Sequence, residues 1–247
     1  MPESGDRPPA PRESASPAPA EVDQVDALTT AALELDQTTA TTIINRILRA
    51  HGVVCAWTDI LAPALRRRGE RFDRTADGVA AEHLLSECIR TALSAVIWRR
   101  RRWNRCAPVL LAAPDGEQHV LPLQALAAAL AEVHQPSVLL GASLPPQALL
   151  DAATQLEPIV IFLWAHTPDT ARRAELTVLR RHPSLDQTTL VLGGPGWPLR
   201  TAGQVGDLPA ALHACTKPTL PARRGSAPAS DLASSPALRT RSGESRG

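Results

Sequence analysis

A carboxylate and an imidazole lie two residues apart in the run DGEQHVLP, at Glu117 and His119. The run follows an apolar segment and precedes an alanine- and leucine-rich one, which is typical of a strand-to-helix turn. A carboxylate at this distance reaches one ring nitrogen, fixes the tautomer and leaves the other nitrogen free to bind a metal. An exposed loop histidine is the alternative. No further ligands follow at zinc spacing, so we expect no zinc site, but a metal that brings its own ligands needs only one histidine.

Two other groups have residue types suited to ligand binding. Gly193 and Gly194 follow a predicted strand, and glycine allows close backbone approach, although turns after strands are often glycine-rich for structural reasons. Glu82 and His83 are adjacent in a predicted helix, where neighbouring side chains point about 100° apart, so a solvent-facing pair is the simpler interpretation. No GxGxxG motif follows the first strand, which disfavours a nicotinamide site.

The first half of the chain has helical periodicity. It predicts helices over 25–35, 38–51, 54–70 and 75–101. Gly52 is expected to stop the second helix, and Pro63 to bend or divide the third. Four amphipathic helices with short connections indicate a four-helix bundle.

The second half alternates short apolar runs with helical patterns. Strands are predicted over 108–113, 137–141, 158–164 and 188–192, and helices over 121–134, 145–155 and 169–181. This order indicates a Rossmann-like, flavodoxin-like parallel sheet covered on both faces, so the fold class is α + α/β. Such sheets bind ligands at the carboxyl ends of their strands. DGEQHVLP, the run Trp164–His166 and Gly193-Gly194 all lie on that edge.

Composition sets the boundaries of the folded part. Residues 1–22 and 217–247 are rich in Pro, Ser, Ala and charge and are predicted to be disordered, which leaves a bundle over 24–103 and a Rossmann-like domain over 106–216. A net charge of +1 gives no general attraction to nucleic acid. Four cysteines without a CxxC motif fit a reduced, cytoplasmic protein. Neither a signal peptide nor a membrane-spanning apolar run is present.

The spacing of the edge motifs resembles that of the cobalamin-binding modules of methionine synthase, corrinoid methyl-transfer proteins and MerR-type light-sensing regulators. Their signature is Asp-x-His-x-x-Gly, followed by Ser-x-Leu and then Gly-Gly. Here the run from Glu117 to Pro122 is followed after 41 residues by Trp164-Ala165-His166, and after 26 more by Gly193-Gly194. Both intervals match those of the family.

The resemblance implies a role for each matched residue of the sheet edge. His119 would be the lower axial ligand to cobalt, replacing the vitamin's own benzimidazole, and Glu117 would orient it. Gly193 and Gly194 would let the displaced nucleotide tail pass the backbone.

The bundle is similar to that of the MerR-type regulators, in which a Trp-x9-Glu-His pattern covers the upper face of the cobalamin. Phe72 stands in place of that Trp, and Glu82-His83 follows after nine residues. The resemblance implies that Phe72, Glu82 and His83 line the upper face, where an adenosyl or methyl group sits.

Several residues depart from the family pattern. Pro122 replaces its glycine, and proline is tolerated in the first turn of a helix. Trp164 and His166 replace the Ser and Leu of Ser-x-Leu. The serine of the family meets the buried benzimidazole, so a tryptophan there would narrow the pocket. Phe72 is smaller than Trp and lacks its N–H.

The resemblance predicts a cobalamin-binding regulatory protein, not an enzyme, that carries adenosylcobalamin or methylcobalamin and responds to light through breakage of the cobalt–carbon bond. The regulators have a helix-turn-helix before the bundle, whereas about 22 residues precede it here, so no sequence-specific DNA binding is expected. Action through a protein partner or self-association is expected instead. A corrinoid methyl carrier and a scaffold that has lost the vitamin are the alternatives.

Overall fold

Helices make up the first half of the protein in the computed structural model, which describes residues 19–72, 76–100, 107–171, 173–198, 201 and 203–218. The elements are α1 (Pro19–Leu33), α2 (Gln37–Cys55), the π-helix η1 (Ala56–Leu61), α3 (Ala62–Phe72) and α4 (Ala76–Arg100). They confirm the predicted helical region. The predicted disorder of 1–22 is wrong for its last four residues, which begin α1; residues 1–18 and 219–247 lie outside the described part.

Both predicted helix interruptions occur, although neither ends the helical path. Gly52 has φ 70 and ψ 172 inside α2, which is therefore kinked there. The N–H of Val53, freed by this kink, donates to Oε2 of Glu132 at 2.9 Å. Pro63 has no N–H to donate, and its ring would clash with the carbonyl oxygen one helical turn earlier. The six residues of η1, directly before α3, form wider π-helical turns.

The second half is a parallel sheet of five strands in the order β2-β1-β3-β4-β5. The strands are β1 (Val109–Pro114), β2 (Ser137–Leu144), β3 (Val160–Trp164), β4 (Thr189–Gly193) and β5 (Gln204–Val205). The helices are α5 (Leu121–Glu132), α6 (Pro146–Leu156), α7 (Arg173–Arg181), the 3-10 turn η2 (Pro183–Leu185) and α8 (Leu208–Thr216). The flavodoxin-like sheet is confirmed, and β5 and α8 were not predicted.

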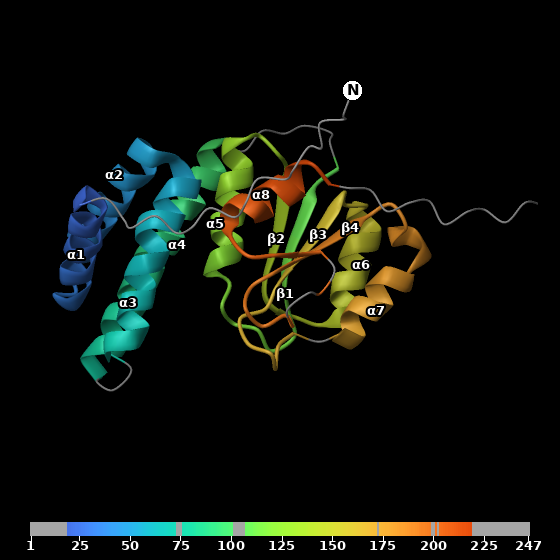
Figure 1. The fold of residues 1–247 in the computed structure, drawn as a ribbon. Helices are drawn as coiled ribbons and strands as arrows, with labels where there is room; N and C mark the ends of the chain where they lie inside the picture. Colours follow the sequence, from blue (N-terminus) through green and yellow to red (C-terminus); the bar gives the residue numbers. More distant parts are fainter. Residues whose placement is uncertain are drawn as a thin grey trace, which may run out of the picture.

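Helices cover both faces of the sheet, with α5 and α8 on the side of the helical half and α6 and α7 on the other (Figure 1). Successive residues of a strand point to opposite faces. Accordingly Val109 and Leu111 join the core that includes α5 and the bundle, whereas Leu110 and Ala112 join the core under α6 and α7.

One of the two hydrophobic cores runs from the bundle into the sheet, although the two halves differ in sequence pattern. The helix between them, α5, is apolar on almost every side, which is the pattern of a fully buried helix. Of its two polar residues, Gln124 donates from Nε2 to Oγ of Ser94 in α4 at 2.7 Å, and Glu132 accepts from Val53 in α2. The bundle is therefore packed firmly onto α5.

The strand order places a topological switch point at β1, because the chain crosses from β1 to β2 on one side and then to β3 on the other. Ligands of doubly wound sheets bind at the carboxyl edge beside such a switch point, here next to the loops after β1 and β3. Within the described residues, no helix is long and apolar enough to cross a membrane.

Candidate functional site

Glu117 is the buried centre of the site, in the turn after β1. Its side chain is 1% exposed, and its two oxygens accept four hydrogen bonds. Oε1 accepts from the backbone N–H of His119 at 2.8 Å and pairs with His119 Nδ1 at 2.7 Å. Oε2 accepts from the backbone N–H of His166 and from the hydroxyl of Thr170, both at 2.6 Å. One carboxylate therefore ties the turn after β1 to the loop after β3.

These hydrogen bonds keep Glu117 ionised. Burial by itself raises the pKa of a carboxyl group because it penalises the charged form. Hydrogen bonds from Thr170, His166 and His119 outweigh that effect and lower the pKa of Glu117 from 4.5 to about 2. An ionised carboxylate only accepts hydrogen bonds, so Nδ1 of His119 must donate the shared proton. In the neutral imidazole, Nε2 then presents a lone pair.

The side chain of His119 is 60% exposed, although Glu117 beside it is buried. The expected contact between the carboxylate and one ring nitrogen is confirmed. An imidazole whose Nδ1 is bound to a buried carboxylate and whose Nε2 is accessible has the arrangement of metal-ligating histidines. The described residues contain no group of three or more His, Cys, Asp or Glu placed to hold an ion. The donor set therefore fits a metal that arrives with its other ligands.

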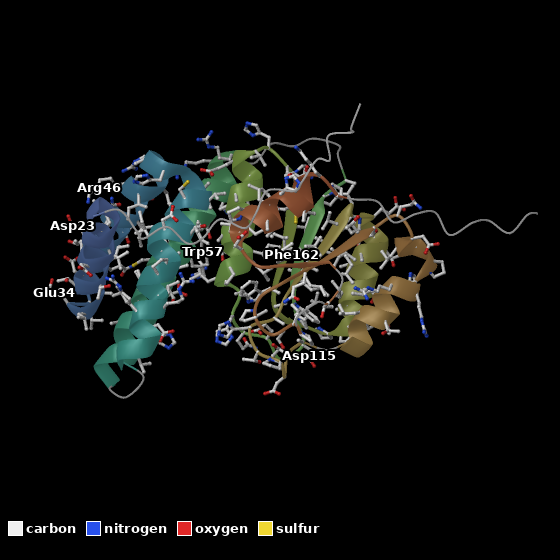
Figure 2. All side chains as sticks on the ribbon, viewed as in Figure 1. Asp23, Glu34, Arg46, Trp57, Asp115 and Phe162 are labelled. Carbon is white, nitrogen blue, oxygen red and sulfur yellow. The ribbon has the colours of Figure 1, made fainter. Side chains whose placement is uncertain are left out.

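The turn that carries His119 is held by Ser143 at the end of β2, a residue that the sequence placed on this edge without a role. The N–H of Gly116 donates to Ser143 Oγ at 2.9 Å, and that hydroxyl donates to Asp115 Oδ1 at 3.2 Å. The N–H of Ser143 donates to the carbonyl of Glu117 at 2.9 Å. Figure 2 shows Asp115 at this edge, away from Phe162 in the sheet. Gly116 has φ 84, which favours glycine.

His166 and Thr170, on the loop after β3, complete the surroundings of Glu117. The centroid of the His166 ring lies 4.3 Å from that of His119, with the planes inclined by 33°. Sequence reasoning placed His166 at this edge but missed Thr170. The signal available for Thr170 was a hydroxyl residue shortly after a strand end on the ligand-binding edge.

Trp164 and the two glycines lie on the neighbouring strands of the same edge. The Cα of Trp164 pairs with that of Gly193. A Cβ on Gly193 would collide with the ring of Phe162, and a Cβ on Gly194 would collide with the carbonyl of Ala165 and lie 3.2 Å from Cδ2 of Trp164. The space beside both glycines is thus filled by the protein's own atoms. This packing does not fit the passage for a nucleotide tail that the resemblance implied.

The remaining predicted residues are dispersed. Pro122 is accommodated in the first turn of α5, where no intrahelical N–H is needed. Glu82 and His83 are exposed on α4, and within the described residues no hydrogen bond or ion pair joins them to His119. Phe72 ends α3, and its side chain lies outside the described part. The structure brings Glu117, His119 and His166 together and does not bring the bundle residues to them.

Comparison with known proteins gives a family match for the helical half and a relative over a longer stretch of the chain. Residues 24–97 match the family model of the B12 binding domain. The HTH-type transcriptional repressor CarH of Myxococcus xanthus is 28% identical over 162 residues, which cover 66% of this chain and 52% of the relative. The chain therefore spans about half the length of the curated relative it matches.

The fold is also shared with a solved structure. The monomethylamine corrinoid protein of Methanosarcina barkeri superimposes with a TM-score of 0.59 at 12% identity, covering 78% of this chain and 97% of that one. At this identity the likeness concerns the fold alone. Residues 24–97 are thus similar to the B12 binding domain, a longer stretch of the chain is similar to a transcriptional repressor, and the fold is that of a corrinoid protein.

Proposed function

We propose that this protein is a cobalamin-binding regulatory sensor in which His119 is the lower axial ligand. The observation that carries the proposal is the Glu117–His119 pair, since the buried carboxylate holds Nδ1 at 2.7 Å and leaves Nε2 accessible. Glu117 and Thr170 orient the imidazole before any ligand arrives, so little freedom is lost on binding. When bound, the corrinoid would supply a cobalt–carbon bond that light can break.

A regulatory role is favoured over a catalytic one by the relative named a transcriptional repressor. A change at the cofactor would be transmitted through α5, because this helix packs against both the sheet and α4. Transmission would end in a protein partner or in self-association. The upper face is proposed to be lined by Phe72, Glu82 and His83, which would require α3 and α4 to approach the carboxyl edge.

Absorption spectroscopy tests the proposal directly. The full chain should take up adenosylcobalamin in the dark with the spectral shift that accompanies replacement of the benzimidazole by histidine, and light should change that spectrum. His119→Ala should lose the shift, whereas His213→Ala, which alters an exposed histidine on α8, should keep it. Retention of the shift in His119→Ala would exclude this histidine as the ligand.

A corrinoid methyl carrier is the second candidate, favoured by the fold shared with a monomethylamine corrinoid protein. A carrier would bind methylcobalamin and pass the methyl group to an acceptor in the presence of a partner methyltransferase. Methyl transfer without any response of the adenosylcobalamin-loaded chain to light would rank the carrier first.

A further inference from the structure

Trp164 ends β3 on the face that carries α5 and α8. Side chains of a strand alternate between faces, so Trp164 follows Val160 and Phe162, whose side chains lie in the core on that side. The indole is partly buried and packs against the same core. It therefore projects from the sheet exactly where the strands end, beside the loop that holds His166.

The indole occupies part of the space beside Gly194. Its Cδ2 lies 3.2 Å from where a Cβ on Gly194 would be, and Phe162 occupies the equivalent space at Gly193. The two rings thus cover consecutive glycines of one edge. Glycine at both positions is explained by these rings and by the carbonyl of Ala165, without any bound ligand.

The polar atom of the indole is not anchored by the surrounding protein. Trp164 Nε1 is buried and has no hydrogen-bond partner among the described residues. The indole of Trp197, by contrast, donates from Nε1 to the carbonyl of Leu163 at 3.3 Å. A buried indole N–H usually finds a partner, so packing alone determines the position of Trp164.

We propose that Trp164 lowers the affinity of this site for corrinoids with an extended nucleotide tail, so that cobalamin binds but a corrinoid without the tail binds more tightly. The inference rests on the proposed function of His119. A tail passing Gly193 and Gly194 would need the volume that the indole occupies, and forcing extra groups into a packed site is costly. The cobalt would need only Nε2 of His119, whose side chain is exposed. Because His119 would supply the lower ligand, the cobalt of a corrinoid without its own nucleotide base would still have a lower ligand.

The test compares two corrinoids that differ in the tail. Aquacobalamin and aquacobinamide, which lacks the nucleotide, are titrated separately into the full chain, and absorbance gives each dissociation constant. Displacing the benzimidazole of aquacobalamin costs free energy whatever residue stands at position 164. The ratio of the two dissociation constants in wild type therefore serves only as the reference value. The informative quantity is the change in that ratio on substitution.

Trp164→Ser should shift the ratio towards aquacobalamin by about ten-fold or more, because it removes the indole, the side chain nearest to Gly194 at this edge. Trp164→Phe keeps a ring but removes the N–H, and should leave the ratio within about three-fold of wild type. Unchanged affinity for aquacobinamide reports that a variant is folded. Trp164→Leu provides a second reduction in volume should the serine variant not fold.

Three results would overturn the inference. An unchanged ratio in both smaller variants would show that the indole does not exclude the tail. A shift in Trp164→Phe as large as that in Trp164→Ser would refute the volume argument, because phenylalanine keeps a large aromatic ring at this position. Failure of wild type to bind either corrinoid would refute both the selectivity and the proposed function. If wild type binds and His119→Ala does not, the proposed function is supported, and either of the first two results refutes the selectivity alone.

Discussion

Replacing Glu117 with Gln keeps the shape of the side chain but removes the charge that four donors share. A glutamine has one acceptor oxygen, and its amide N–H₂ would face one of the two donor pairs, either that of His119 or that of His166 and Thr170. Two buried donors would then lose their acceptor. We expect the substitution to lower the free energy of unfolding and to release the imidazole.

The magnitude follows from the pKa of Glu117. A fall from 4.5 to about 2 means that the folded protein favours the ionised form, by about 3 kcal/mol at 1.36 kcal/mol for each ten-fold change. Because the pKa is lowered on folding, this stability is fully present above pH 4.5 and is lost as the pH falls towards about 2. Glu117→Gln should therefore cost about 3 kcal/mol at pH 7, and the difference from wild type should shrink below pH 4.5.

Urea denaturation of the cofactor-free chain, followed by circular dichroism at several pH values from 7 to 3, measures this difference. Glu87→Gln is the matched control, since Glu87 is an exposed carboxylate paired with Arg90 and its loss should cost no more than about 1 kcal/mol. A loss below about 1 kcal/mol for Glu117→Gln at pH 7, or a difference that does not shrink in acid, would refute the reasoning.

Three other predictions concern packing. Gly194→Ala should destabilise the fold by about 2 kcal/mol or more, because φ is +97 and the Cβ meets backbone, whereas Gly206→Ala should be nearly neutral in the same thermal melt. Glu132→Ala should cost about 1–3 kcal/mol in urea by removing the acceptor for the N–H at the α2 kink; an unchanged midpoint would contradict this. Burial raises the pKa of Cys215 to about 12, so a thiol reagent at pH 8 should label exposed Cys55 and should label Cys215 only after the protein is unfolded. Mass spectrometry of the labelled peptides measures this, and equal labelling of both cysteines in the folded protein would contradict it.

The sequence predicted elements well where periodicity was strong and poorly where an element exists only through its contacts. β5 has two residues, Gln204 and Val205, and is defined solely by pairing with β4. α8 carried a readable start signal, because Asp207 caps it and accepts from the N–H of Ala210 at 2.7 Å. Because that signal lies close to the proline- and serine-rich tail, no helix was predicted there.

The division into two domains also followed from local pattern alone. The period of the apolar residues changes between the halves, and a boundary near 103–106 was the natural interpretation. The structure instead carries one core across that boundary, since α5 is buried against α4 as well as against the sheet. Periodicity reports which residues are buried but not what buries them.

What the sequence determined by itself was local: a carboxylate two residues from a histidine, at the end of a strand, brings Glu117 to the ring of His119. Tertiary structure decided the rest, because the other partners lie far along the chain. The donors of His166 and Thr170 reach Glu117 across 49 and 53 residues, and they depend on β1 and β3 being neighbours. The contact of Trp164 with Gly194 likewise requires β3 beside β4, so only the folded sheet reveals that the space beside the glycines is filled.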